Sequence, residues 1–184
     1  MSSQTARDQL LDAAEELFYE RGYQAVGMDA LRAASGLPLK RIYSLFAGKD
    51  AIAVAMLDRR DERWRASLAQ RVAQETQPKG QVLAIFDWLS DWLAGEGHRG
   101  CAWINAFGEL GGTSLDVAES VRRHKIRLRN YVNDVVAGTG APQATADAIF
   151  LLIEGCMVTA GISGNADAAE QAKAAADRLL AANN

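Results

Sequence analysis

Residues 35–50 constrain the fold of this chain more than any other segment. They read Ser-Gly-Leu-Pro-Leu-Lys-Arg-Ile-Tyr-Ser-Leu-Phe-Ala-Gly-Lys-Asp. Gly36 suits the left-handed position of a tight turn, and Pro38 suits a first helical turn, where the missing N–H is not needed. Ile42 and Phe46 lie four residues apart, so they share one helix face. The segment therefore predicts the turn and second helix of a helix-turn-helix, followed by the start of another helix.

The rest of the chain also has a helical pattern. Only three of the 184 residues are proline, 49% are hydrophobic, and alternating strand patterns are missing. These features predict an all-α protein of about nine helices. The expected helices cover residues 8–21, 28–35, a short stretch from 38, 49–75, 80–95, 101–112, 115–137, 143–163 and 167–182. Glycine-containing breaks separate most of them.

This helix pattern predicts two parts joined by a long helix. Residues 1–50 would form a helix-turn-helix head, residues 49–75 a linking helix, and residues 76–184 a larger body for ligand binding and dimerisation. No run of 18 apolar residues and no apolar leader occur, so neither a membrane helix nor a secretory signal is expected. Two cysteines cannot build a disulfide framework, which favours a reducing, cytoplasmic setting.

Charge is distributed unevenly along the chain. Residues 21–49 hold five basic residues and one acidic residue, a net charge of +4. The remaining residues hold 15 basic and 22 acidic residues, a net charge of −7, and the whole chain carries −3. A basic head on an acidic protein can bind phosphate locally while the rest keeps the protein in solution. The charge pattern therefore favours DNA as the partner of the head.

Within the head, the short third helix carries the candidate DNA contacts. With Ile42 and Phe46 buried, Lys40 and Tyr43 fall on other faces, where Lys40 can reach a base edge or a phosphate. Arg41 can pair bidentately with guanine or phosphate. Lys49 begins the next helix, whose free N–H groups can help to hold a phosphate. The full set of predicted DNA-binding residues is Met28, Pro38, Leu39, Lys40, Arg41, Tyr43 and Lys49.

Residues 10–58 resemble the DNA-binding head of the TetR family of transcriptional regulators. The residues that carry the resemblance are Ala14, Phe18, Gly22, Tyr23, Val26, Leu31, Ala34, Gly36, Ile42, Tyr43, Phe46, Lys49 and Ala51. The resemblance implies a homodimeric repressor of about nine helices with a divergent ligand-binding body. Gly27-Met28, Pro38 and Lys40 depart from the family's common pattern, so the resemblance implies a docking mode and no operator sequence.

The body is rich in aromatic residues, which favours a small-molecule site. Apolar cavities with a few polar groups commonly bind small molecules, and the family resemblance implies an inducer pocket here. The predicted ligand-binding residues are Trp88, Trp92, Trp103, Asn105, Phe107, Glu109, His124 and Met157. The alternative is that these aromatics form ordinary core and that Glu109 is a structural hydrogen-bonding group.

The last two helices are candidates for a dimer interface. Residues 148–160 are apolar nearly all round, so that helix needs partners on more than one side. The final helix carries a stripe of small residues that permits close approach. Together they predict a four-helix seam about a two-fold axis, formed by Ile149, Leu152, Ile153, Cys156, Ala169, Ala172, Ala176 and Leu179. The alternative is a hairpin within one chain.

Other chemistry is weakly indicated. The cationic run 122–129 favours a solvated surface paired with acids, although a second DNA patch or an anion site stays open. His98-x2-Cys101 offers two metal ligands, fewer than a site needs. A redox role for Cys101 would need a lowered thiol pKa. With no glycine-rich phosphate loop and no catalytic set, we expect no enzyme activity, cofactor or metal.

The sequence therefore predicts a cytoplasmic, ligand-responsive repressor. Its partners would be a palindromic double-stranded operator, a small-molecule inducer and a second copy of the chain, with no membrane involved. One alternative is a helical enzyme or small-molecule carrier with a vestigial DNA-binding head. Another is a constitutive dimeric architectural protein without a ligand cavity.

Overall fold

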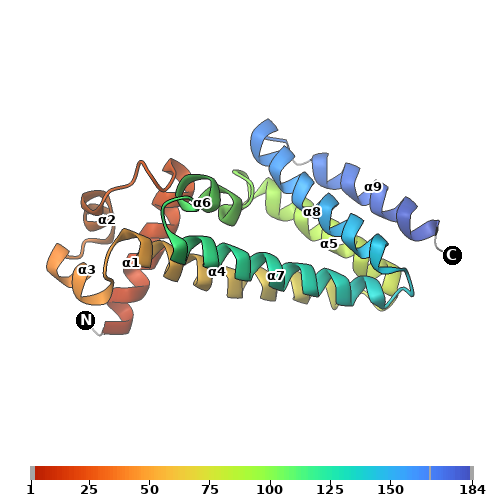
Figure 1. The fold of residues 1–184 in the computed structure, drawn as a ribbon, viewed down its shortest axis with the longest axis horizontal. Helices are drawn as coiled ribbons and strands as arrows, with labels where there is room; N and C mark the ends of the chain where they lie inside the picture. Colours follow the sequence, from red (N-terminus) through yellow and green to blue (C-terminus); the bar gives the residue numbers. More distant parts are fainter. Residues whose placement is uncertain (1–2, 166, 183–184) are drawn as a thin grey trace. The chain divides into compact units, whose positions relative to one another are not determined.

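The structure, a computed structural model, describes residues 3–165 and 167–182 and contains nine helices and no strand within them (Figure 1). This finding confirms the predicted all-α class. The helices are α1 (Ser3–Arg21), α2 (Met28–Ser35), α3 (Leu39–Leu45), α4 (Lys49–Val72), α5 (Pro78–Ala94), α6 (Ala102–Leu110), α7 (Leu115–Ala137), α8 (Gln143–Ser163) and α9 (Asp167–Ala181).

Glycines set the ends of the first two helices. Gly22 follows α1 with φ 86°, and Gly36 follows α2 with φ 65°, a backbone region that side-chain-bearing residues rarely adopt. Pro38 is the N-cap of α3, and its carbonyl accepts the amide hydrogens of Arg41 and Ile42. The turn predicted from residues 35–50 is therefore present in the described part of the chain.

The predicted helix ends differ most from the observed ones in α1 and α4, while α3, α5, α6 and α9 differ by one or two residues. The first helix begins at Ser3 instead of residue 8, because Ala6 is fully buried and extends the apolar stripe of α1 by a turn. The linking helix ends at Val72 instead of residue 75. The backbone amides of Gln74 and Glu75 then bond to carbonyls three residues back, which is the tighter pattern common at helix ends.

The chain divides into two compact units. The head unit consists of Met1–Glu62 and Ala102–His124, and the body unit of Arg63–Cys101 and Lys125–Asn184. The head unit thus contains α6 and the first part of α7 as well as α1–α3, which a boundary at residue 50 or 76 does not anticipate. The domain division given by the sequence stays a prediction, since this grouping describes packing and not independent folding.

In the head unit, α1, α2 and α3 pack on one another. Leu10, Leu31 and Ile42 are fully buried, and Phe46 is nearly so. Ile42 and Phe46 therefore share an inward face as their spacing predicts. The guanidinium of Arg7 lies 4.3 Å from the centre of the Phe46 ring and covers its outer side. This core fixes the orientation of α3.

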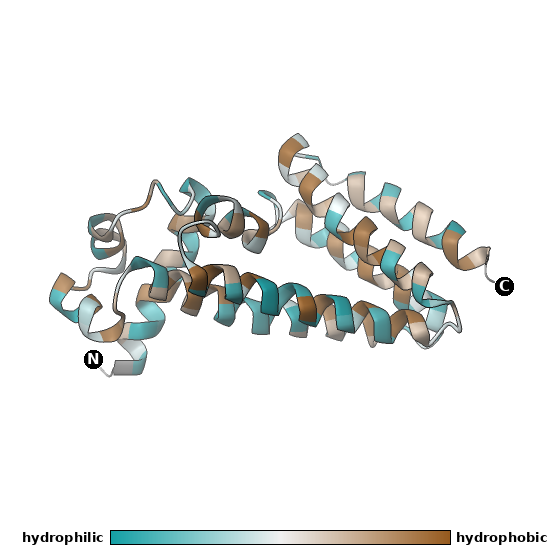
Figure 2. Cartoon of the chain, in the orientation of Figure 1, coloured by the Kyte–Doolittle hydropathy of each residue, from teal (hydrophilic) through white to brown (hydrophobic). Residues whose placement is uncertain are grey.

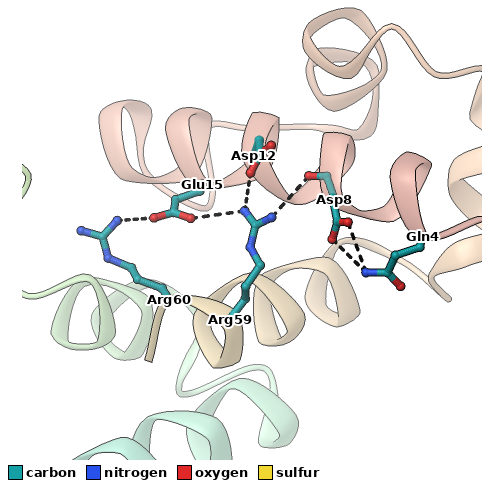
Figure 3. A network of polar contacts seen from close by, with 6 residues as sticks. All are labelled: Gln4, Asp8, Asp12, Glu15, Arg59 and Arg60. Carbon is teal, nitrogen blue, oxygen red and sulfur yellow. Dashed lines mark hydrogen bonds and ion pairs between the residues drawn. The ribbon is translucent and has the colours of Figure 1, made fainter. Parts of the chain in front are cut away.

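Ion pairs between α1 and the middle of α4 lie in the same unit (Figure 3). Arg60 Nη1 lies 2.6 Å from Glu15 Oε1, and Arg59 Nη2 lies 2.7 Å from Asp12 Oδ1 and 3.4 Å from Glu15 Oε2. The Arg59 side chain also donates to the carbonyl of Asp8. Arg60 is buried and stacks over the ring of Tyr19, so its pair with Glu15 is shielded from water.

In the body unit, α5, α8 and α9 pack together. Small residues on α9, including Ala169, Ala172 and Ala176, are buried in this packing. Lys173 of α9 bonds to Asp87 of α5, which also pairs with Arg71. These contacts link the final helix to the core of the same chain.

Helix α8 is the most apolar long helix of the body unit (Figure 2). One side, with Ile149 and Ile153, is buried, whereas Leu151, Val158 and Ile162 are exposed. It is also the one described helix long and apolar enough to cross a membrane, with mean hydropathy 1.6 over 18 residues, 39% of them buried in the fold. Core helices pass the same test, so length and composition here are weak evidence for a membrane span.

We expect Glu15→Ala to lower the free energy of unfolding by about 2–3 kcal/mol, because Arg60 would lose its short ion pair in a buried setting. Urea unfolding followed by circular dichroism measures this change. The matched control is Asp12→Ala, since Asp12 is 73% exposed and its pair with Arg59 should contribute less than about 1 kcal/mol. Equal effects of both variants would contradict the importance of the buried pair.

Candidate nucleic-acid interface and ligand site

The outer face of α3 is polar, basic and open. Lys40 is exposed, Tyr43 is 53% exposed, and Arg41 is partly exposed. No side-chain hydrogen bond or ion pair involves these three residues within the described residues, while Ser44 Oγ donates back to the carbonyl of Arg41. The buried Ile42 holds the helix from the opposite side. This face is therefore available to bind an anionic partner.

The remaining predicted DNA contacts surround α3. Met28, the first residue of α2, and Leu39, the first residue of α3, are partly exposed, and Pro38 is exposed. Lys49, the first residue of α4, donates from Nζ to the carbonyl of Tyr23 at 2.9 Å. The ammonium of Lys49 thus has a partner within the chain, whereas the sequence suggested only a phosphate. The contacts of Met28, Pro38, Leu39 and Lys49 with DNA stay a prediction.

The turn between α1 and α2 is held by α6. The backbone amide of Gln24 donates to Glu109 Oε2 at 2.8 Å, and Gln24 Nε2 donates to the carbonyl of Glu109 at 2.7 Å. Tyr23 is buried, stacks on Phe18 with ring centres 4.9 Å apart, and its hydroxyl lies 3.4 Å from the carbonyl of Ala102. Glu109 therefore makes structural hydrogen bonds, as in the alternative that the sequence left open, and its role in ligand binding stays a prediction.

Another predicted ligand residue, His124, is a buried partner of Asp61. The two side chains are each about 2% exposed, with His124 Nδ1 2.7 Å from Asp61 Oδ1. The imidazole stacks on Trp103, with ring centres 3.6 Å apart and planes 3° apart. Asp61 was not singled out from the sequence. Its position on α4, three to four residues from Leu57 and Trp64 within a buried stripe, was the available signal of a buried polar partner.

The other candidate ligand residues of the head unit differ in exposure. Phe107 is about half exposed, and Asn105 is partly buried. Phe107 packs against Gly111, where an added Cβ would meet its ring at 2.7 Å. Trp103 is fully buried. Their predicted role in ligand binding stays a prediction.

The body unit contains a cluster of three indoles. The Trp88 and Trp92 rings are stacked with centres 5.9 Å apart, as their spacing predicts, and Trp64 meets both edge-on. Trp88 Nε1 donates to Ser67 Oγ, but Trp92 Nε1 is buried and has no hydrogen-bond partner among the described residues. Met157 is buried in the same unit. An unsatisfied buried donor is costly, so a ligand acceptor would stabilise it.

Most of the predicted dimer residues lie inside the chain itself. Six of them are buried, namely Ile149, Ile153, Cys156, Ala169, Ala172 and Ala176, while Leu152 and Leu179 are partly exposed. The sequence could not tell which side of the apolar helix faces α5 and α9. The apolar surface of α8 that is open to a second copy carries Leu151, Val158 and Ile162 instead.

The cationic run 122–129 is paired with acids, as the sequence favoured. In the head unit, Arg122 pairs with Glu119, and Arg123 with Asp58. In the body unit, Lys125 and Arg129 pair with Glu154 and Asp147, respectively. The charges of these four cations are therefore offset locally, which argues against a second DNA patch.

The two cysteines differ in their surroundings. Cys101 Sγ lies 3.5 Å from Lys125 Nζ; burial lowers the pKa of Lys125, but the nearby Cys101 and Glu154 outweigh it and raise that pKa overall. Burial, together with Glu154, raises the pKa of Cys156 to about 12. His98 bonds to the carbonyl of Gly95, and no group of three metal-ligating side chains occurs within residues 3–165 and 167–182.

The observed head has the architecture of helix-turn-helix DNA-binding proteins, and comparisons with known proteins agree with this class. Residues 10–56 match the family model described as bacterial regulatory proteins, tetR family. The transcriptional repressor ComR of Escherichia coli is 29% identical over 67% of this chain, and the activator FasR of Mycolicibacterium smegmatis is 30% identical over 50%. The matches span 60% and 43% of those relatives.

Longer matches extend the likeness to the body. The repressor NemR of Escherichia coli is 24% identical over 95% of this chain and 94% of its own. The crystal structure of SCO4454, a TetR-family regulator from Streptomyces coelicolor, has a TM-score of 0.89 and 26% identity, covering 98% of this chain and 96% of that one. The chain therefore has the fold of TetR-family regulators, and its residues 10–56 match the model of that family.

We expect Cys156 to resist thiol reagents in the native protein. With a pKa of about 12, its thiol is protonated below that pH, so only about one molecule in 10⁴ is a thiolate at pH 8. Labelling with iodoacetamide at pH 8, followed by peptide mass spectrometry, should leave Cys156 unmodified, whereas the guanidinium-unfolded chain should be labelled there. Rapid native labelling of Cys156 would contradict this environment.

Proposed function

We propose that this protein is a dimeric, ligand-responsive transcriptional repressor that binds a palindromic DNA operator through α3. The observation that carries the proposal is the exposed face of α3, where Lys40, Arg41 and Tyr43 have no side-chain partner in the described chain. Lysine and arginine side chains bind phosphates and guanine edges, and a tyrosine hydroxyl suits a phosphate. The match of residues 10–56 to the family model and the basic charge of residues 21–49 support the same function.

The proposed dimer uses the exposed side of α8. Leu151, Val158 and Ile162 follow one another at helical spacings of seven and four residues, so they lie on one face, and Gly155 on that face would permit close approach. A two-fold axis along this face pairs identical apolar surfaces. Two heads on one dimer would then enter successive major grooves, about 34–36 Å apart in the simplest docking geometry.

The proposed inducer binds in the body unit near the indole cluster. Trp64, Trp88 and Trp92 provide apolar surface, and the unsatisfied Nε1 of Trp92 offers one buried hydrogen-bond donor. A flat apolar molecule with an acceptor group fits these features. Such a ligand would release DNA only by binding more tightly to the arrangement that does not fit the operator, since coupling between two sites is reciprocal.

The likeness to transcriptional regulators also suggests whether the protein is an enzyme and where in the cell it acts. TetR-family relatives of this chain are regulators, and no catalytic activity is indicated by them. We therefore propose a non-enzymatic protein of the bacterial cytoplasm, where its DNA target would lie. A helical enzyme with a vestigial head would show no DNA binding, and a constitutive architectural protein would bind DNA without a response to any ligand.

We expect Lys40→Ala combined with Tyr43→Ala to weaken binding to the DNA upstream of the protein's own gene by about 30- to 100-fold, because two contacts from α3 are lost. The slope of log K against log salt should fall by about one for the lost lysine contact. Fluorescence anisotropy with a labelled duplex measures both quantities.

The matched control for this pair is Arg122→Ala. Arg122 is an exposed cation of the head unit whose recorded partner is Glu119, so its removal should change the affinity by less than about threefold. Wild-type affinity in the double variant would argue against α3 as the reading helix. A large loss in Arg122→Ala would instead point to α7 as a DNA-contacting element.

We expect Ile162→Glu to convert the dimer to a monomer, because two buried carboxylates would face each other across the proposed two-fold axis. Sedimentation velocity measures the change in mass. Leu115→Glu is the matched control, since Leu115 and Ile162 are both 83% exposed but lie on different helices and in different units. A dimer that survives in Ile162→Glu and dissociates in Leu115→Glu would place the interface elsewhere.

A further inference from the structure

The turn after α1 meets α6 through a reciprocal pair of hydrogen bonds. The main chain of Gln24 donates to the side chain of Glu109, and the side chain of Gln24 donates to the main chain of Glu109, at 2.8 and 2.7 Å. Two bonds of this kind fix both the distance and the relative orientation of the two segments. A single side-chain contact would leave the turn free to rotate about it.

Close packing adds to these bonds. A Cβ added to Gly22 would lie 3.0 Å from Glu109 Oε1 and 3.1 Å from Oε2, so the carboxylate rests directly against the backbone of the turn. Gly22 also has φ 86°, which a larger residue rarely adopts. The glycine thus serves two purposes, because it ends α1 and admits the Glu109 carboxylate.

The same turn is joined to the start of α4. Lys49 Nζ donates to the carbonyl of Tyr23 at 2.9 Å, and Lys49 is the first residue of α4. The first amides of a helix have no partner within the helix, so those of α4 can help Lys49 to hold a DNA phosphate. A movement of the turn would therefore change the position of Lys49. The contacts form a chain from Glu109 through residues 22–24 to Lys49.

We propose that Glu109 is a positioning residue for DNA binding: its carboxylate holds the turn 22–24, and through that turn it sets Lys49 and the start of α4 for contact with a phosphate. This inference rests on the proposed DNA-binding function. Glu109 itself touches no DNA in this account. Its exposed partner Gln24 makes the contact breakable, whereas the buried ring of Tyr23 keeps the turn folded when the contact opens.

Through the Gln24–Glu109 bonds, the position of α6 should affect the affinity of the head for DNA. A shift of α6 would pull on Gln24, and the loss of both bonds would leave Tyr23 as the remaining link described here between the turn and α6. The two Gln24–Glu109 bonds hold the turn in one arrangement and so pre-organise the head for DNA, and their removal should weaken specific binding. Sequence-independent binding depends mainly on total charge and should change much less.

The test uses four variants of the full-length protein. Glu109→Ala removes the acceptor, and Glu109→Gln keeps an oxygen that can accept the amide hydrogen of Gln24. Glu119→Ala removes an exposed carboxylate of the same unit and controls for the change in charge. Asp147→Ala removes a surface carboxylate of the body unit, which accepts bonds from Arg129 and Gln143, and controls for a general loss of stability.

Each variant is titrated by fluorescence anisotropy against the duplex from the upstream region and against a random duplex of equal length. Hydrogen exchange of the peptide that contains Gln24 reports whether the turn is released. We expect Glu109→Ala to speed exchange and to weaken upstream-DNA binding about tenfold. Glu109→Gln should stay within about threefold of wild type, as should both controls and all binding to the random duplex.

Three outcomes would overturn the inference. Faster exchange in Glu109→Ala with unchanged affinity for the upstream DNA would mean that the turn does not position Lys49 and the start of α4 for DNA binding. An equal loss of DNA affinity in Glu109→Ala and Asp147→Ala would mean that Glu109 acts only through the overall stability of the protein. If neither wild type nor Glu119→Ala binds the upstream duplex, the proposed DNA-binding function itself is contradicted. The positioning role of Glu109 would then be lost with it.

Discussion

The packing of Tyr23 is the interaction on which the rest of the head depends. Its ring is buried against Phe18, its hydroxyl reaches the carbonyl of Ala102, and its own carbonyl accepts the Lys49 ammonium. One residue thereby joins α1, α6 and the start of α4. The turn cannot move without disturbing all three, so it sets where α2 begins, while the buried core of Leu10, Leu31 and Ile42 orients α3. The exposed face of α3 lies opposite the buried Ile42.

Helix α6 and the first part of α7 belong to the head unit and make polar contacts within it. Helix α6 is held to the turn at its start by the carbonyl of Ala102 and at its end by Glu109, while the buried pair of His124 and Asp61 joins α7 to α4. These are polar contacts inside a packed unit, where a lost partner is costly. Such contacts favour a small number of discrete arrangements over continuous deformation, which a regulatory protein requires.

The helices and the head were predictable from sequence because local signals decide them. Gly22 and Gly36 end helices, and the Ile42–Phe46 spacing defines the buried face of α3. The long-range pairs were not predictable, since the partners of Glu109 and His124 lie 85 and 63 residues away in sequence. The inward side of α8 was not predictable for a similar reason: α8 is apolar on nearly all sides, and only its packing shows that Ile149 faces inward and Ile162 outward.

We propose that the protein binds DNA as a symmetric dimer in which each head contacts one half-site. Hydroxyl-radical footprinting of the region upstream of the gene, with the purified full-length protein, tests it most directly. We expect a protected palindrome whose two half-sites face the same side of the duplex, about one helical turn apart in the simplest docking geometry. If no site is protected at protein concentrations that saturate nonspecific binding, specific DNA binding by the head is contradicted. A single unpaired half-site would contradict the proposed dimer.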